Sequence, residues 1–190
     1  VWDDRVAGVD QGDAVAQWLT AYLGTACRLV RFDRRTPRPC SDKWTDGTAA
    51  STFFADGYPL LLATEAAGTE LAERVQAAGG PAVEVLRFRA NVVLGGLPAH
   101  EEDHLAQLHI HTAGGVATLR PVKPCTRCPI PDIDPATAES SHHVSAALAA
   151  YRADARMGGA ITFGMNSIVQ AGAGLVLEVG QPVAGELAFD

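Results

Sequence analysis

Two cysteines three residues apart, Cys125 and Cys128, stand in the run from Arg120 to Pro129. Lys123 and Arg127 lie in the same run, and its prolines keep the backbone extended. A thiolate is both a soft metal ligand and a nucleophile, and neighbouring cations favour the thiolate over the thiol. The run therefore suits metal ligation or thiol chemistry.

Two stretches of the chain carry no acidic residue, although the whole protein has a formal net charge of −7. One extends from Leu105 to Pro131 and includes both cysteines; the other extends from Arg87 to His100. An acidic protein that keeps two segments basic is expected to use them to hold an anion.

Length and composition narrow the class of protein. The 190 residues, of which 47% are hydrophobic and 19% charged, predict one globular domain over 1–190. No apolar run approaches the roughly 20 residues of a membrane helix, and the negative charge argues against nucleic-acid binding. We therefore expect neither a membrane nor a nucleic acid as a partner. Four cysteines in a chain of this size do not form a disulfide scaffold, which favours the cytoplasm.

Periodicity predicts short strands with helices inserted between them. Helices are expected over 13–23, 65–78 and 144–156, and a long surface loop over 33–52. Strands are expected over 27–32, 60–63, 88–94, 107–112, 116–122, 161–169 and 175–179. The predicted fold class is mainly β with peripheral helices (α+β), built as a closed or nearly closed barrel.

Three other interpretations of the cysteine pair have to be considered. A structural zinc site needs two more ligands, and the adjacent His142 and His143 lack zinc-finger spacing. A thioredoxin-type pair sits at a helix N-terminus, which Pro129 and Pro131 disfavour. The cysteines could also be two unrelated buried thiols. The remaining interpretation is that one cysteine ligates a softer metal centre while the cations hold an anionic ligand.

The segment from Val122 to Cys128, followed by Asp134-Pro135, resembles the signature of MOSC domains. These are the domains of molybdenum-cofactor sulfurase C-termini and of the amidoxime-reducing component and its bacterial relatives. Three further segments are similar to that family in the same order: Phe54 to Ala66, Arg87 to Val93, and Phe163 to Asn166 with Val179 to Val183 after it.

The resemblance implies a molybdenum-cofactor (Mo-molybdopterin) site in which Cys128 is the metal ligand and the catalytic residue. It implies no role for Cys125. Arg89 and Arg127 are expected to pair with the pterin phosphate, and we expect both to line one concave pocket with Cys128. Asn91, Thr126 and Asn166 are the remaining expected cofactor contacts.

Several polar residues could have a structural role instead of a role in cofactor binding. Arg87, placed on the same strand face as Arg89, could be the anion contact or a solvated charge. Asn91 could satisfy a strand end. His109 and His111 are expected to be exposed polar residues.

The function that the resemblance implies is an oxidoreductase that reduces a small N-hydroxylated substrate, with electrons from a separate donor protein. The alternative is a non-catalytic carrier or binding module for molybdenum cofactor or sulfur. Pyridoxal phosphate (PLP), or no cofactor at all, is the alternative to molybdenum. We expect no iron–sulfur cluster, because no cysteine follows Cys128, and neither the N-terminal β domain nor the C-terminal ferredoxin domain of relatives.

Overall fold

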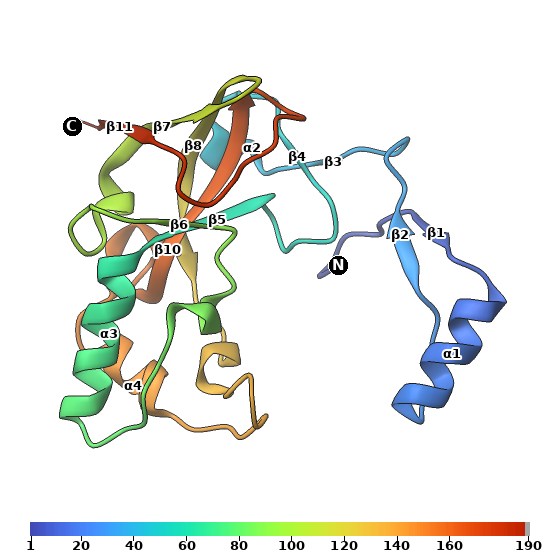
Figure 1. Cartoon of the computed structure of the whole chain (residues 1–190), viewed down its shortest axis with the longest axis horizontal. Helices are drawn as coiled ribbons and strands as arrows, with labels where there is room; N and C mark the ends of the chain where they lie inside the picture. The colour runs from blue at the N-terminus through green and yellow to red at the C-terminus, as the bar shows by residue number, and fades with distance from the viewer. Residues whose placement is uncertain (189–190) are drawn as a thin grey trace. The chain divides into compact units, whose positions relative to one another are not determined.

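A computed structural model of the chain describes residues 1–188 (Figure 1). The chain divides into two compact units, Val1–Tyr58 and the part from Pro59 onward. The expectation of one domain over 1–190 stays a prediction.

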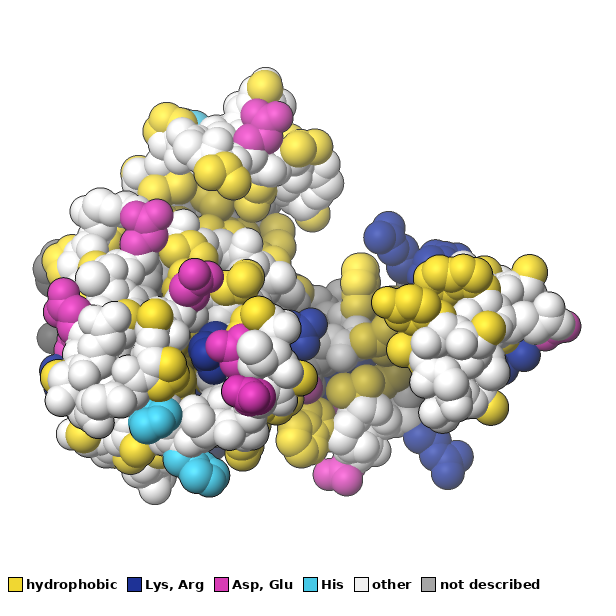
Figure 2. Space-filling model, turned by 60° about the horizontal axis from the view of Figure 1, so that its bottom comes forward, with side chains coloured by type: hydrophobic (Ala, Val, Ile, Leu, Met, Phe, Trp, Pro, Cys, Tyr) yellow, Lys and Arg dark blue, Asp and Glu magenta, His cyan; other side chains and the backbone are white. Residues whose placement is uncertain are grey.

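The surface carries charges of both signs. Cations and carboxylates are interspersed among apolar and polar side chains on the face that Figure 2 shows. Across residues 1–188, the structure holds no helix that is both long and apolar enough to cross a membrane.

The first unit is built from short elements around a small aromatic cluster. Strand β1 (Gly8–Asp10) pairs antiparallel with β2 (Val30–Phe32), and helix α1 (Asp13–Leu23) connects them. Strand β3 (Arg38–Pro39) pairs with β4 (Ser51–Thr52) across the short helix α2 (Asp42–Thr45). The ring of Phe32 stacks on Phe53 and meets Phe54 edge-on, at centroid distances of 4.7 and 5.5 Å.

The second unit is a curled, mostly antiparallel sheet with helices on its periphery (Figure 1). Its order is β11-β7-β8-β10-β5-β6, and β9 pairs with β10. The strands are β5 (Leu60–Thr64), β6 (Val92–Leu94), β7 (Leu105–Thr112), β8 (Gly115–Thr126), β9 (Ala153–Asp154), β10 (Ala160–Ala171) and β11 (Val183–Leu187). Among the described residues β11 and β6 do not pair, so the sheet is a half-barrel. The predicted strand-rich α+β class is confirmed.

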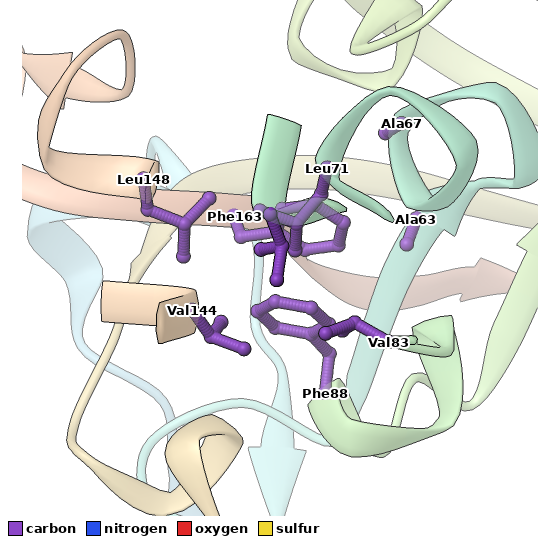
Figure 3. Packing of buried hydrophobic residues seen from close by; sticks show 9 residues of the cluster. Ala63, Ala67, Leu71, Val83, Phe88, Val144, Leu148 and Phe163 are labelled. Atoms are coloured by element: carbon purple, nitrogen blue, oxygen red, sulfur yellow. The ribbon is translucent and has the colours of Figure 1, made fainter. Parts of the chain in front are cut away.

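Helices α3 (Glu65–Ala77) and α4 (His143–Ala149) cover one side of this sheet. Between them lies a core in which the rings of Phe88 and Phe163 stack at 3.8 Å, surrounded by Leu71, Val83, Val144 and Leu148 (Figure 3). Phe88 belongs to η1 (Val85–Phe88), one of four short 3₁₀ segments. The others are η2 (Glu101–His104), η3 (Ile130–Asp132) and η4 (Ala155–Met157).

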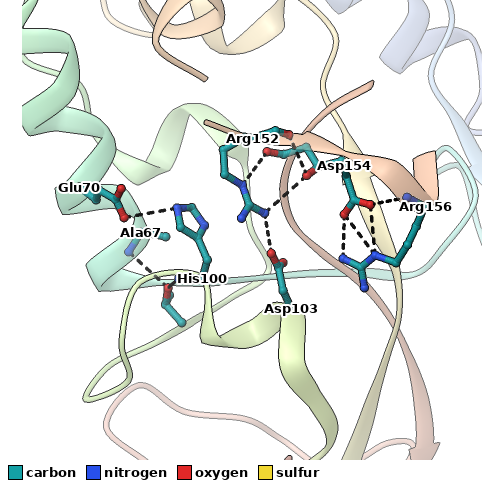
Figure 4. Close-up of polar contacts among 9 residues, drawn as sticks. Ala67, Glu70, His100, Asp103, Arg152, Asp154 and Arg156 are labelled. Atoms are coloured by element: carbon teal, nitrogen blue, oxygen red, sulfur yellow. Dashed lines mark hydrogen bonds and ion pairs between the residues drawn. The ribbon is translucent and has the colours of Figure 1, made fainter. Parts of the chain in front are cut away.

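A half-buried polar cluster holds the segment after α4 in place (Figure 4). Arg152 donates to the Asp103 carboxylate at 2.7 Å and to the Thr162 carbonyl oxygen at 3.2 Å. His100 lies beside Glu70, and burial, with the charge of Arg152, holds the pKa of this imidazole below its ordinary value.

Strand β10 is irregular where it approaches β5. Its pairing with β8 shifts between Thr162 and Met165, and Gly164 in the shift has φ +74°. A Cβ built on Gly164 would overlap the Leu62 carbonyl oxygen of β5. Only glycine allows this close approach.

The helices over 13–23 and 65–78 are confirmed to within a residue. The helix expected over 144–156 is wrong in length, because residues after Ala149 pair with β10 as β9. The strand expected over 175–179 is wrong: that segment is a turn region between Gly172 and Gly180, which both have positive φ, and the edge strand is β11.

Candidate functional site

The two cysteines lie at the end of β8 and in the loop after it. The backbone N–H of Arg127 donates to the Ile161 carbonyl oxygen at 3.0 Å, so the chain stays beside β10 for one residue beyond the strand. Cys125 is half-buried in β8, whereas Cys128 is exposed at the start of the loop. Cys128 is therefore the thiol that a ligand from solvent can reach.

Arg127 is held on the inner side of this loop. Its Nη1 donates to the Cys125 Sγ at 3.0 Å, and its guanidinium carbon lies 5.2 Å from the centroid of the Phe88 ring. Its Nε is buried and has no hydrogen-bond partner among residues 1–188. A buried donor without a partner is costly, and an anionic group close to Arg127 would relieve that cost.

Two aspartates, Asp132 and Asp134, connect the cysteine loop to the rest of the unit through hydrogen bonds and an ion pair. Asp132 is only 3% exposed, and its Oδ1 accepts hydrogen bonds from the backbone N–H groups of Val144 and Ser145, at 3.1 and 3.0 Å. It thus caps the first turn of α4 from outside the helix. Asp132 was not among the residues predicted for the site. The sequence feature that could have indicated it is an acidic residue directly after Pro131, two positions before the Asp134-Pro135 pair.

The second connection is an ion pair between Asp134 and Arg87. The Asp134 Oδ2 lies 2.7 Å from Arg87 Nη2, and Arg87 Nη1 donates to the Pro131 carbonyl oxygen at 3.3 Å. The backbone N–H groups of Ala136 and Thr137, assisted by the charge of Arg87, hold the pKa of Asp134 below its ordinary value. The carboxylate therefore stays ionised at neutral pH and keeps its partner.

Arg87 and Arg89 do not share one strand face, contrary to the expectation from sequence. Arg87 is buried and ends in its ion pair with the half-buried Asp134, whereas Arg89 is exposed. The cause is local: residues Val85–Phe88 form η1, and Arg89 follows in the left-handed conformation with φ +55°. The strand expected over 88–94 is thus shortened to Val92–Leu94, and Arg87 acts as an anchor inside the protein.

The expected polar contacts lie along neighbouring strands. Asn91 exchanges two hydrogen bonds with the backbone of Leu61, at 2.8 and 2.9 Å, which satisfies a strand start. Asn166 stands opposite both Leu61 and Lys123 in the ladder. These residues form a row across the sheet, about 10 Å along β8 from the exposed Thr126 at three residues of 3.3 Å each.

A cavity of about 170 Å³ opens beside Cys128. Arg127 and Cys128 line it, and Arg89 is not among its lining residues. The expectation that Arg127 and Cys128 share a pocket agrees with this placement, whereas the part of Arg89 in the site stays a prediction. Apolar side chains from the loop, α4 and β10 form most of the remaining wall: Pro129, Pro131, Val144, Leu148 and Ile161.

The donor set fits a metal that brings most of its own ligands. Within residues 1–188, no three His, Cys, Asp or Glu side chains gather as a protein-bound metal ion would require. The site instead offers one exposed soft sulfur donor beside an arginine with an unpaired buried N–H. Such a set suits a molybdenum centre whose remaining ligands belong to an anionic organic cofactor.

Known proteins resemble the chain across this region. Mitochondrial amidoxime reducing component 2 of Rattus norvegicus is 34% identical over 137 residues, which cover 70% of this chain and 38% of the relative. Mitochondrial amidoxime-reducing component 1 of Homo sapiens is 30% identical over 138 residues, with the same two shares. Molybdenum cofactor sulfurase of Caenorhabditis briggsae is 33% identical over 162 residues, which cover 84% of this chain and 19% of the relative.

The chain thus spans less than two fifths of the length of these relatives. The profile of the family described as MOSC domain matches residues 50–184, which include β5, the cysteine loop and β10. Since that match covers more than half of the sequence, the chain belongs to the MOSC domain family.

Proposed function

We propose that this chain binds molybdenum cofactor with Cys128 as the metal ligand and serves an oxidoreductase that reduces N-hydroxylated compounds. The observation that carries the proposal is the placement of Cys128, exposed beside Arg127, on a loop tied by Asp132 and Asp134. The family membership and the similarity to amidoxime-reducing components support it.

In this proposal each site residue has a separate role. Cys128 supplies a soft, permanent ligand, and Arg127 faces the anionic part of the cofactor. Arg89, exposed at the end of η1, is the proposed phosphate partner, and Thr126 and Asn166 offer polar contacts along β8 and β10. When bound, molybdenum cofactor supplies two-electron redox chemistry with oxygen-atom exchange. Electrons come from a separate donor protein.

A carrier of molybdenum cofactor or sulfur is the second candidate, because the chain is also similar to molybdenum cofactor sulfurases. It would use the same thiol without turnover. The cytoplasm remains our expected location for either activity.

Metal content tests the proposal before any activity is assayed. The chain is produced in a host that makes molybdenum cofactor, and molybdenum per chain is measured by elemental mass spectrometry. We expect Cys128→Ser to lose the metal, because a serine hydroxyl is harder and stays protonated at neutral pH.

Cys125→Ser is the matched control, since serine also accepts a hydrogen bond from Arg127 and should keep most of the metal. Equal loss in both variants would favour a two-cysteine site such as zinc, and loss in neither would end the cofactor proposal. Reduction of an amidoxime with reduced methyl viologen as donor then separates the two candidates: retained metal without turnover indicates a carrier.

A further inference from the structure

Strand β11 is one edge of the sheet in the second unit and lies beside β7 (Figure 1). All five of its residues are exposed, with 38% of the surface of Val183 and 42% of that of Leu187 open to solvent. In the part of the chain that the structure describes, β7 is its sole partner strand. The other edge of β11 can therefore accept a strand from a second molecule.

The register with β7 decides which backbone groups of β11 point outward. The His111 N–H donates to the Pro182 carbonyl oxygen at 3.1 Å, and in an antiparallel pair the bonded residues alternate. Every second residue after Pro182 therefore also bonds to β7. The register shift in this pair leaves its extra residue, Ala106, on β7, so the alternation along β11 is unbroken. The outward N–H and C=O groups belong to the residues in between: Val183, Gly185 and Leu187.

The same three residues continue the apolar core face of the sheet to its edge. Side chains that stand directly opposite in an antiparallel pair lie on one face. Their partners on β7 are all buried: Ile110, Leu108 and Leu105. Leu105 also fills the place where a side chain on Gly185 would stand. The edge of β11 thus combines unpaired backbone groups with half-exposed aliphatic side chains.

The features that usually protect an edge strand are missing from the sequence of β11. Val-Ala-Gly-Glu-Leu contains no lysine, arginine or proline. Its one charged residue, Glu186, belongs to the opposite face. The Glu186 Oε1 lies 3.0 Å from Nε2 of His109, whose Nδ1 lies 3.2 Å from the Thr118 hydroxyl. The carboxylate is held against the sheet and does not repel an incoming strand.

We propose that β11 pairs antiparallel with β11 of a second copy of this chain, across a two-fold axis at Gly185. In this register Val183 stands opposite Leu187 of the second copy, and Glu186 stands opposite Ala184. Every outward N–H meets an outward C=O, the aliphatic side chains pack across the axis, and no two carboxylates are directly opposed. A two-fold contact of this kind is closed, so it produces a dimer and not a filament.

Sedimentation velocity of the full chain, without cofactor, tests the association. The strand contributes five residues on each side, fewer than the about 20–30 of a standard interface, so we expect a weak dimer that forms only at high protein concentration. Val183→Lys should abolish it, because a lysine on an edge strand prevents pairing. Val93→Lys is the matched control: Val93 is 39% exposed on β6, the opposite edge of the sheet, and the dimer should remain.

The double variant Val183→Lys, Leu187→Glu tests the register. Across the proposed axis each introduced lysine faces an introduced glutamate, so the double variant should recover the dimer that Val183→Lys loses. Amide hydrogen exchange followed by NMR gives a second test. The Gly185 N–H should exchange more slowly at high than at low protein concentration, whereas the Ala184 N–H, which bonds to β7, should be equally slow at both.

An unmodified chain that is still monomeric at about 1 mM overturns the inference. So does a dimer that survives in folded Val183→Lys, and failure of the double variant to recover the dimer overturns the axis at Gly185. Loss of the dimer in Val93→Lys would indicate pairing of β11 with β6 of the next copy, which also contradicts the two-fold contact. If Val183→Lys does not fold, Val183→Pro takes its place, because proline removes only an outward N–H there.

Discussion

Gly164→Ala should be far more destabilising than its small size suggests. An alanine at φ +74° costs about 1–2 kcal/mol through backbone strain alone. Its Cβ would also overlap the Leu62 carbonyl oxygen, so β10 must move away from β5. The two strands pair at three positions, and losing two or three hydrogen bonds at about 0.5–1.5 kcal/mol each adds about 1–4.5 kcal/mol. Together with the backbone strain, we expect a total loss of about 2–6 kcal/mol.

Gly158→Ala is the matched control, because Gly158 has φ +66° and open space around its Cβ position. It should lose only the strain, about 1–2 kcal/mol. Urea unfolding should be followed by far-ultraviolet circular dichroism, which reports on the secondary structure, since Trp2, Trp18 and Trp44 all lie in the first unit and β10 belongs to the second. A difference between the variants below about 0.5 kcal/mol would refute the close approach of β10 and β5.

Three further predictions concern buried groups of the second unit. Phe88→Ala should cost about 3–5 kcal/mol in urea unfolding, because the ring is 2% exposed and stacks on Phe163, whereas Leu86→Ala, 63% exposed, should stay within about 0.5 kcal/mol. Burial raises the pKa of the Glu102 carboxyl, so the folded state favours its neutral form, and the free energy of unfolding should fall as pH rises from the pKa of the unfolded state toward that of the folded state. Glu102→Gln should remove this fall, which is checked by measuring the free energy of unfolding of both proteins at pH 5 and at pH 8. Asp132→Ala should cost about 0.5–2 kcal/mol by uncapping α4, while Asp132→Asn, which keeps the acceptor, should cost less; equal losses in urea would contradict the capping role.

The elements that are local in sequence could be predicted, and those that depend on distant partners could not. The helix over Glu65–Ala77 is capped by Thr64, whose side chain accepts a hydrogen bond from the backbone N–H of Ala67. The sequence predicts this cap because its residues lie within one helical turn of one another. The end of α4 is different. Tyr151 fits helical spacing, but Arg152 bonds to Thr162 and Asp103, and neither partner is near it in sequence.

The site divides in the same way. The cysteine pair and its cations are visible as a local motif, and the structure brings Cys128 and Arg127 to one cavity. The different environments of Arg87, which is buried, and Arg89, which is exposed, could not be predicted, because they follow from the left-handed conformation of Arg89, which alternation cannot reveal. The apolar residues that line the cavity come from the cysteine loop, α4 and β10, so no single segment of the sequence predicts the cavity.

The ties on the cysteine loop bear on how the protein would mature. Where a metal supplies the folding energy, as in zinc fingers, the empty chain is unfolded and a chelator unfolds the complex. Here Asp132 and Asp134 fasten the loop to α4 and Arg87 through protein groups alone. If the chain binds molybdenum cofactor as proposed, these contacts would let the loop fold before the cofactor arrives, and a chain that has lost the cofactor would keep its fold and escape degradation.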